Sequence, residues 1–151
     1  MLMRLRDGVE SDLPDLIQLA HEMLESSGFS RFKPNPHKIS SLFEFLIDDE
    51  DALLIVAIDR DQLSGFFAAE IVPLLFSDEL LAVDVAMFAS SHSSKNLPIR
   101  KISEIYLKWA KHKGASRAIF SQSTGVNTER FSKIFDRLDF QRLGSIHGFD
   151  L

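Results

Sequence analysis

Apolar residues recur with the period of an amphipathic helix in four stretches of the chain. The stretches are residues 11–24, a segment that opens at Asn35-Pro36, residues 98–114 and residues 127–140. Residues that favour helix ends flank them, with Asp12 and Asn127 as N-caps and Gly114 as a C-cap. The pattern therefore predicts four helices.

Three apolar runs lie between the second and third predicted helices, separated by short polar turns. They are residues 52–59, 63–76 and 80–89. Such spacing predicts an antiparallel meander, and the almost continuous first run is typical of a strand covered on both faces. Pro73 indicates that the second strand bends or ends there. Further strands are expected at residues 3–9, 116–124 and 141–151, which gives the order β-α-α-β-β-β-α-β-α-β.

Length and composition predict a single domain over residues 1–151. An apolar fraction of 45% supports one substantial core. The absence of cysteine excludes a disulfide framework and a thiolate metal site, and it favours the cytosol. The N-terminus does not resemble a secretory signal, and no apolar stretch approaches the roughly eighteen residues of a membrane span. We therefore expect a cytoplasmic protein that does not bind a membrane.

A net charge of −5 argues against nucleic-acid binding by the domain as a whole, because the phosphate backbone is also negative. The charge is uneven, however, because residues 95–113 carry six basic side chains against the single acid Glu104. Such a segment suits a small anionic ligand, or it forms a solvated helix face. The five histidines show no metal-ligand spacing, so no metal site is expected.

The element order at this length resembles that of the GCN5-related N-acetyltransferase family. Two stretches carry the resemblance: WAKHKGASRAIF, as the end of the central helix and the entry to the fifth strand, and STGVNTERFSKIFDRLDFQRLGS, as the C-terminal motif. The short final segment looks most like acetyltransferase-like proteins of bacteriophages. The resemblance covers essentially the whole chain. It implies a mixed α/β sheet of the acyl-CoA N-acyltransferase fold, whose fourth and fifth strands run parallel and splay apart.

The resemblance implies that acetyl-CoA is the acyl donor. In the family, a glycine-rich loop before the central helix binds the pyrophosphate through backbone N–H groups. The matching positions lack glycine, and they are Ser94, Lys95, Asn96, Leu97, Pro98 and Ile99. We expect N–H donors at Lys95, Asn96, Leu97 and Ile99, with added charge from Lys95, Arg100 and Lys101. Pantetheine would pair with Met87, Phe88 and Ala89, while Asn127 is either the Asn of the family motif or a plain N-cap.

Acetyl transfer to an amine requires a general base, which in the family is often a carboxylate on or near the fourth strand. Asp84 and Glu70 are the candidates, although Asp84 could equally point to an exposed face. Many family members use a Tyr on the last helix as the general acid, and Phe135 stands at that position here. The only tyrosine, Tyr106, lies on an apolar stripe and is expected in the core.

Two functions follow from these observations. The leading one is an acetyl-CoA-dependent N-acyltransferase that acts on an amine of a small molecule or a protein. The alternative is a non-catalytic binding protein of the same fold, for example a phage protein directed at a host partner. Missing glycines and Phe135 favour the alternative, whereas the basic loop and the Asn127 motif favour the enzyme. The phenylalanine-rich stretches predict core packing, with a homodimer face as the next interpretation.

Overall fold

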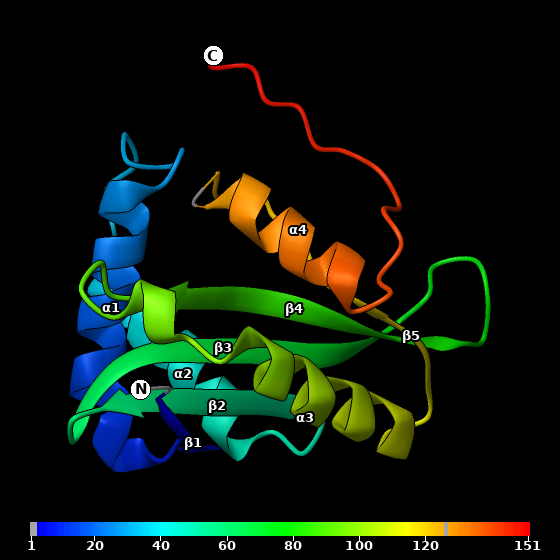
Figure 1. Ribbon diagram of the computed structural model, residues 1–151, viewed down its shortest axis with the longest axis horizontal. Helices are drawn as coiled ribbons and strands as arrows, with labels where there is room; N and C mark the ends of the chain where they lie inside the picture. The colour runs from blue at the N-terminus through cyan, green and yellow to red at the C-terminus, as the bar shows by residue number, and fades with distance from the viewer. Residues whose placement is uncertain (1–2, 126) are drawn as a thin grey trace.

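A mixed sheet with helices on both faces forms the body of the protein in the computed structural model, which describes residues 3–125 and 127–151 (Figure 1). Its elements are β1 (Arg4–Asp7), the 3-10 turn η1 (Glu10–Asp12), α1 (Leu13–Ser26), α2 (Pro36–Asp48), β2 (Ala52–Asp59), β3 (Gln62–Pro73), β4 (Leu80–Ala89), the 3-10 turn η2 (Ser94–Asn96), α3 (Ile99–His112), β5 (Ala115–Ile119) and α4 (Thr128–Arg137). Within the described ranges, no helix has the length and apolarity needed to cross a membrane.

Within the described residues, the five strands lie in the order β1-β2-β3-β4-β5; the β4–β5 pair is parallel and the other pairs are antiparallel. This arrangement confirms both the predicted meander and the parallel pairing of the fourth and fifth strands. The β4–β5 pairing covers only Leu80 to Val83 on β4, whereas β4 itself continues to Ala89. The second half of β4 is therefore not paired with β5, and the two strands part after Val83.

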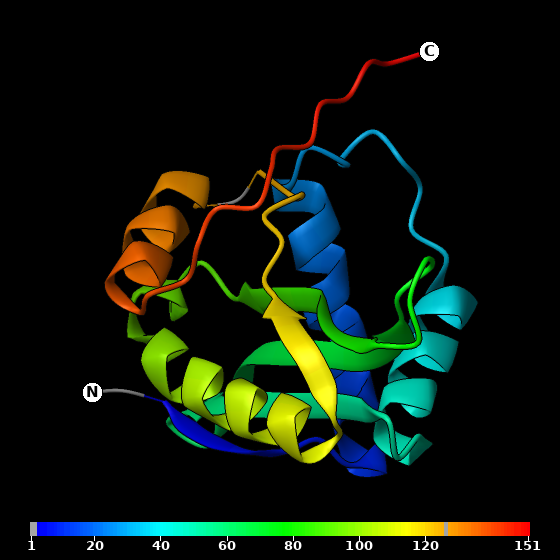
Figure 2. The ribbon, with the colours of Figure 1, turned by 90° about the vertical axis from the view of Figure 1, so that its right-hand side faces the viewer.

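Strand β2 shows why its sequence is almost continuously apolar. Leu54, Val56 and Ile58 pack with α1 and α2 on one face of the sheet. Ile55 and Ala57 belong to the core that contains α3 on the other face. Figure 2 shows these helices on opposite sides of the strands. Because both faces of the sheet are covered, successive residues of β2 enter an apolar environment whichever face they point to.

Phenylalanine rings fill both cores, as the sequence predicts. Phe66 packs edge-on against Phe43 of α2, with ring centroids 5.3 Å apart. Its neighbour Phe67 points to the opposite face and packs against Tyr106 of α3 at 5.0 Å. Burial of each such ring contributes about 1.5–3 kcal/mol to the free energy of unfolding. Among the described residues, five other phenylalanine rings are exposed, namely Phe29, Phe32, Phe45, Phe76 and Phe149.

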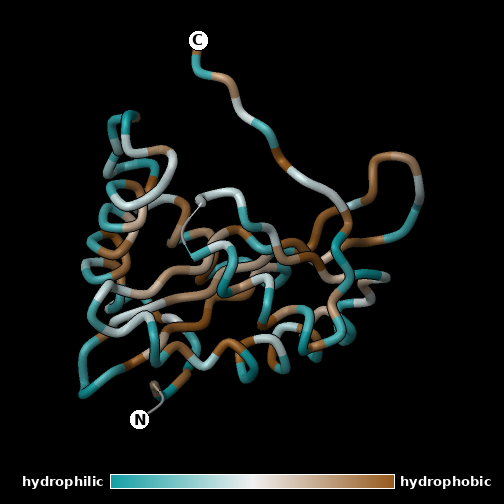
Figure 3. Tube along the Cα trace, turned by 45° about the horizontal axis from the view of Figure 1, so that its top comes forward, coloured by the Kyte–Doolittle hydropathy of each residue, from teal (hydrophilic) through white to brown (hydrophobic). Residues whose placement is uncertain are grey.

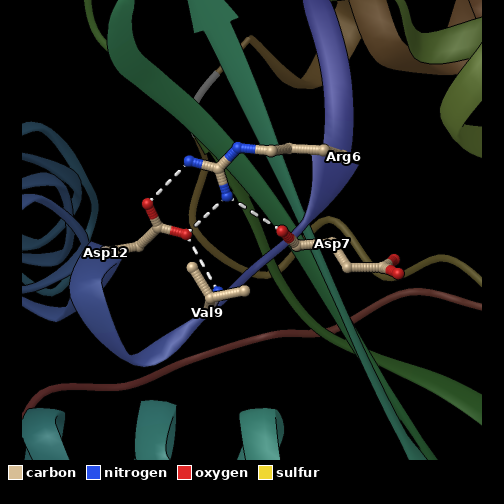
Figure 4. Close-up of polar contacts among 4 residues, drawn as sticks. All are labelled: Arg6, Asp7, Val9 and Asp12. Carbon is tan, nitrogen blue, oxygen red and sulfur yellow. Dashed lines mark hydrogen bonds and ion pairs between the residues drawn. The ribbon is translucent and has the colours of Figure 1, made fainter.

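The turn between β1 and α1 is fixed by the carboxylate of Asp12 (Figure 4). Two guanidinium nitrogens of Arg6 donate to its two oxygens at 2.7 and 2.8 Å, and the Val9 N–H donates at 2.9 Å. The Arg6 guanidinium holds the pKa of Asp12 below its usual value. Asp12 does occupy the N-cap position of α1, but its side chain closes the preceding turn instead of capping the helix.

The predicted final strand over residues 141–151 is wrong. These residues form neither strand nor helix, and they extend away from the end of α4 (Figure 1). With the two-residue period of a strand, Leu143 and Phe149 would face one side and Ile146 the other. No single face of the segment is apolar, and Gly144 and Gly148 further disfavour a strand. The preceding strand is also shorter than predicted, because β5 ends at Ile119.

Candidate active site

An irregularity in β4 places Asp84 where the sheet opens. Ala86 pairs with Ala68 of β3, but the next pair along the strands is Asp84 with Ala69, so that Val85 forms a bulge. Asp84 is also the first β4 residue beyond the pairing with β5. Since its partner Ala69 belongs to the core around α3, the Asp84 side chain lies on that face of the sheet. The exposed-face interpretation of Asp84 is therefore wrong, and the residue is partly buried.

The segment that follows β5 holds the Asp84 carboxylate from across the gap. The Ser121 N–H donates to Oδ1 at 2.8 Å, and the Ser121 hydroxyl donates to Oδ2 at 3.2 Å. Burial raises the pKa of Asp84 to about 6, although both bonds from Ser121 act in the opposite direction. A carboxyl group with this pKa is largely ionised at neutral pH and is basic enough to accept a proton.

Glu70 does not join Asp84. It pairs with Val83 of β4 and lies two residues beyond Ala68, which belongs to the core around α1 and α2. By the alternation of side chains along a strand, Glu70 faces α1 and α2 while Asp84 faces α3. The structure thus separates the two predicted acids by the thickness of the sheet.

Neither aromatic residue of interest offers a proton donor at the gap. Tyr106 is fully buried, and its hydroxyl donates to the carbonyl of Ile119 at 3.0 Å. Burial raises the pKa of Tyr106 above its usual value, so the prediction of a core role is confirmed. Phe135 of α4 stacks on Phe120 with ring centroids 4.6 Å apart and is 7% exposed. The ring at the position of the family's tyrosine is therefore a packing residue.

The predicted pantetheine segment follows Asp84 on β4. Met87, Phe88 and Ala89 pair with β3 along one edge, and their other edge lies past the end of the β4–β5 pairing. Phe88 and Ala89 are 8% and 7% exposed, so their side chains are anchored in the two cores. Their backbone groups border the gap, as an extended ligand arm would require.

The loop between β4 and α3 differs from the predicted cradle of free N–H groups. The N–H of Asn96 donates to Ser93 at 2.9 Å, that of Leu97 to Ser94 at 3.4 Å and that of Ile99 to Leu97 at 2.9 Å. The expectation that these three donors are open is wrong for this conformation, because the segment without glycine coils into the 3-10 turn η2. Leu97 and Ile99 also bury their side chains.

Cationic side chains surround this loop. Lys95 lies in η2, while Arg100 and Lys101 in the first turn of α3 are exposed and pair with Glu104 at 3.4 and 3.6 Å. Helix α4 adds Arg130, whose guanidinium donates to the carbonyls of Ser94 and Lys95 at 3.1 and 3.2 Å. A groove of 480 Å³ along α4 is lined by Glu129, Arg130, Lys133, Ile134 and Arg137. Sequence reasoning missed Arg130 because only the fold brings α4 next to η2.

Asn127 has an unusual backbone at the start of α4. Its φ of 53° lies in the left-handed region, and its carbonyl accepts from the Phe131 N–H at 3.0 Å. Its side chain makes no capping hydrogen bond to the helix. Asn127 therefore occupies the predicted N-cap position of α4, but its side chain does not cap the helix.

A second groove, of 620 Å³, lies between α1 and the end of β4. Helix α1 contributes the carboxylates of Asp15, Glu22 and Glu25, and the loop after β4 contributes Ser90 to Ser93. The groove is thus acidic where the α4 groove is basic. In the part of the chain that the structure describes, no group of three or more His, Asp or Glu side chains is arranged to hold a metal ion.

Comparisons with known proteins place this geometry in context. No protein-family model matches the chain, and no curated protein matches it either. Solved structures do. A predicted acetyltransferase with acetyl-CoA from Clostridium acetobutylicum is 13% identical, with a TM-score of 0.75 and coverage of 99% of this chain and 96% of that one. AAC(6')-Iy, in complex with the bisubstrate analog CoA-S-monomethyl-acetylneamine, is 14% identical, with a TM-score of 0.74 and coverage of 100% and 99%.

A transcriptional regulator from Bacillus halodurans C-125 is similar as well, at 19% identity, a TM-score of 0.71 and coverage of 99% and 98%. At these identities the likeness establishes the fold and leaves the activity to be argued from the site. The chain has the mixed α/β fold of the GCN5-related acetyltransferases.

Proposed function

We propose that the protein is an acetyl-CoA-dependent N-acetyltransferase that transfers an acetyl group to an amine of a small molecule or a protein. The observation that carries this proposal is Asp84, a carboxylate with a pKa of about 6 at the point where β4 and β5 part. An acceptor amine is an ammonium ion at neutral pH and must lose a proton before its nitrogen can attack the thioester. Asp84 is the base in this proposal, and Glu70, on the opposite face, is not.

The donor side of the proposal rests on side-chain charge. Lys95, Arg100 and Lys101 surround the start of α3, and Arg130 reaches the same loop from α4. These groups are suited to the pyrophosphate of acetyl-CoA, which the engaged N–H groups of η2 cannot hold without rearranging. Met87 to Ala89 would present the backbone edge of β4 to the pantetheine arm.

The test is calorimetric titration of the protein with acetyl-CoA. Lys95→Ala together with Arg100→Ala should weaken binding about ten-fold, which corresponds to about 1.4 kcal/mol. Lys108→Ala with Lys111→Ala removes the same charge from the other part of α3 and is the matched control, with affinity expected to stay near that of the wild type. An equal loss of affinity for acetyl-CoA in both double variants would mean that binding depends only on the net charge of the protein.

Turnover is measured by release of free CoA with a thiol reagent, and the chain has no cysteine to add background. Suitable acceptors are sisomicin, spermidine and a lysine-containing peptide, which cover aminoglycoside, polyamine and protein amines. The proposal requires release that depends on an acceptor and disappears in Asp84→Asn. Binding of acetyl-CoA without transfer to any of the three would contradict an enzyme acting on these classes of amine.

A non-catalytic binding protein of the same fold is the second candidate. The packing of Phe135 in place of a phenol and the bonded N–H groups of Asn96, Leu97 and Ile99 favour it. It predicts a flat calorimetric titration with acetyl-CoA under conditions in which the protein is folded. The same experiment therefore separates the two functions before an acceptor is known.

Cytoplasmic location, similarity to phage-encoded members of the family and a homodimer are further proposals that rest on the sequence. Hydrophobic residues lie at the tip of the β3–β4 hairpin, as the hydropathy colours of Figure 3 show, and they are compatible with the dimer. Leu75 and Phe76 there are 86% and 95% exposed. Sedimentation of the wild type and of Phe76→Ser tests it, because the variant should be monomeric if this tip forms the contact.

A further inference from the structure

Ser121 is tied to Asp84 by two separate donors. Its N–H donates to Oδ1 at 2.8 Å and its hydroxyl donates to Oδ2 at 3.2 Å, so that one residue engages both carboxylate oxygens. The residues belong to different walls of the gap, because Asp84 lies on β4 and Ser121 follows the end of β5. The contact is therefore produced by the tertiary fold and lies where the two strands have parted.

The two members of this pair differ in access. Ser121 is exposed, whereas Asp84 is partly buried. A hydroxyl group has one proton to donate and two lone pairs to accept with. The proton of the Ser121 hydroxyl is directed to Asp84, which leaves its lone pairs available to a donor outside the pair. The exposed oxygen thus offers an approach to the less accessible carboxylate.

We propose that the Ser121 hydroxyl is the outer end of a two-member proton relay into Asp84 and that it contacts the acceptor amine. The inference rests on the proposed acetyltransferase function. In the step, an N–H bond of the acceptor ammonium breaks and its proton bonds to Ser121 Oγ. The original Oγ–H bond breaks at the same time, and that proton bonds to Asp84 Oδ2. The electron pair of the broken N–H bond stays on nitrogen, which becomes the neutral nucleophile.

The products of this step are a neutral amine, a protonated Asp84 and an intact Ser121 hydroxyl, so one proton has moved from nitrogen to Oδ2. The backbone N–H of Ser121 remains on Oδ1 and keeps the carboxyl group in place throughout. Burial and, to a smaller extent, the Asp84 carboxylate raise the pKa of Tyr106 of α3, and the Tyr106 hydroxyl is committed to the Ile119 carbonyl. It does not compete with Ser121 for the proton.

Three variants test the relay. Ser121→Ala removes the hydroxyl and keeps the backbone donor, Ser121→Thr restores a hydroxyl, and Ser123→Ala is the control in the same exposed segment. Ser121→Ala should lower kcat for transfer from acetyl-CoA to sisomicin, spermidine or the lysine-containing peptide by about 100-fold, the lower range for a lost acid–base group. Ser121→Thr should recover most of that loss, while KM for acetyl-CoA and the rate of Ser123→Ala should remain unchanged.

Two further measurements distinguish a relay from a supporting contact. The pKa of Asp84, followed by carbon-13 NMR of its carboxyl group, should rise in Ser121→Ala and not in Ser121→Thr, because the hydroxyl bond stabilises the anion. The solvent isotope effect on kcat in mixtures of light and heavy water should indicate two protons in flight in the wild type and one in Ser121→Ala.

The outcomes separate this inference from the function on which it rests. A wild type that transfers no acetyl group contradicts both the relay and the enzyme. An active wild type whose kcat and Asp84 pKa are insensitive to Ser121→Ala overturns the relay alone. Loss of activity with a single proton in flight in the wild type also overturns it, since Ser121 would then only position Asp84.

Discussion

The carboxylate at the gap should make the protein less stable than a neutral side chain there would. Burial raises the pKa of Asp84 from 3.8 to about 6. At neutral pH this difference lowers the free energy of unfolding by about 3 kcal/mol, because each unit of pKa difference corresponds to about 1.4 kcal/mol. Asp84→Asn removes the charge, and its amide oxygen still accepts from the Ser121 N–H. Because the bond from the Ser121 hydroxyl is weakened, we expect a net gain of about 1–3 kcal/mol at pH 8.

The gain should depend on pH with a definite sign. A folded-state pKa above the unfolded value of 3.8 means that the contribution of Asp84 to the stability of the wild type is most favourable below about pH 4 and falls as the pH rises through about 6. The variant lacks this dependence. The difference between the two proteins should therefore vanish near pH 4 and reach its full size above about pH 7.

Urea unfolding at pH 4, 6 and 8 measures this difference. The only tryptophan, Trp109, stacks against Tyr106 in the core and reports unfolding through its fluorescence. Asp78→Asn, on the exposed β3–β4 hairpin, is the matched control and should change the free energy of unfolding very little. An Asp84→Asn protein that is less stable than the wild type at pH 8, or equally stabilised at pH 4, would refute the argument.

Two more predictions concern the scaffold. Asp12→Asn should lower the free energy of unfolding by about 1–2 kcal/mol at pH 7 because it weakens two charged hydrogen bonds from Arg6. Since the pKa of Asp12 is lowered in the folded state, urea unfolding should show that this loss becomes smaller between pH 4 and pH 2. A loss that stays constant over this range would contradict the prediction. Gly65→Ala should cost about 1–3 kcal/mol in the same assay, since its methyl group would lie 3.0 Å from the Phe88 carbonyl oxygen, whereas Gly144→Ala, with open space around it, should be neutral.

Periodicity in the sequence was sufficient to predict the helices and the meander because each of these elements buries its own apolar face. The apolar stripe of α3 and the continuous apolar run of β2 indicate directly which faces of these elements are buried. The segment 141–151 has no such pattern, although a strand was predicted there from the sequence. Its scattered apolar residues do not form one apolar face, and they were not sufficient to predict a strand.

The candidate site was only partly predictable. Asp84 stood out as a charged residue within an apolar strand, and it is partly buried, while its catalytic role stays a prediction. Ser121 and Arg130 could not be found in the same way. Their roles depend on how far β5 pairs with β4 and on where α4 lies beside η2, and neither is encoded in a local pattern. The separation of Glu70 from Asp84 has a similar cause, since the bulge at Val85 sets the face of the sheet on which Asp84 lies.

The loop before α3 shows how the loss of glycine changes the kind of anion site that a fold can offer. A glycine-rich loop presents backbone N–H groups to the anion, and the direction of these groups is fixed by the fold. Here Asn96, Leu97 and Ile99 direct these groups to carbonyls of the loop itself. What remains is the charge of Lys95 and of side chains from α3 and α4, which is exposed to solvent and screened by salt. Binding of acetyl-CoA through such groups is a matter of electrostatic attraction more than of shape, and it can be retained without the glycines on which a backbone cradle depends.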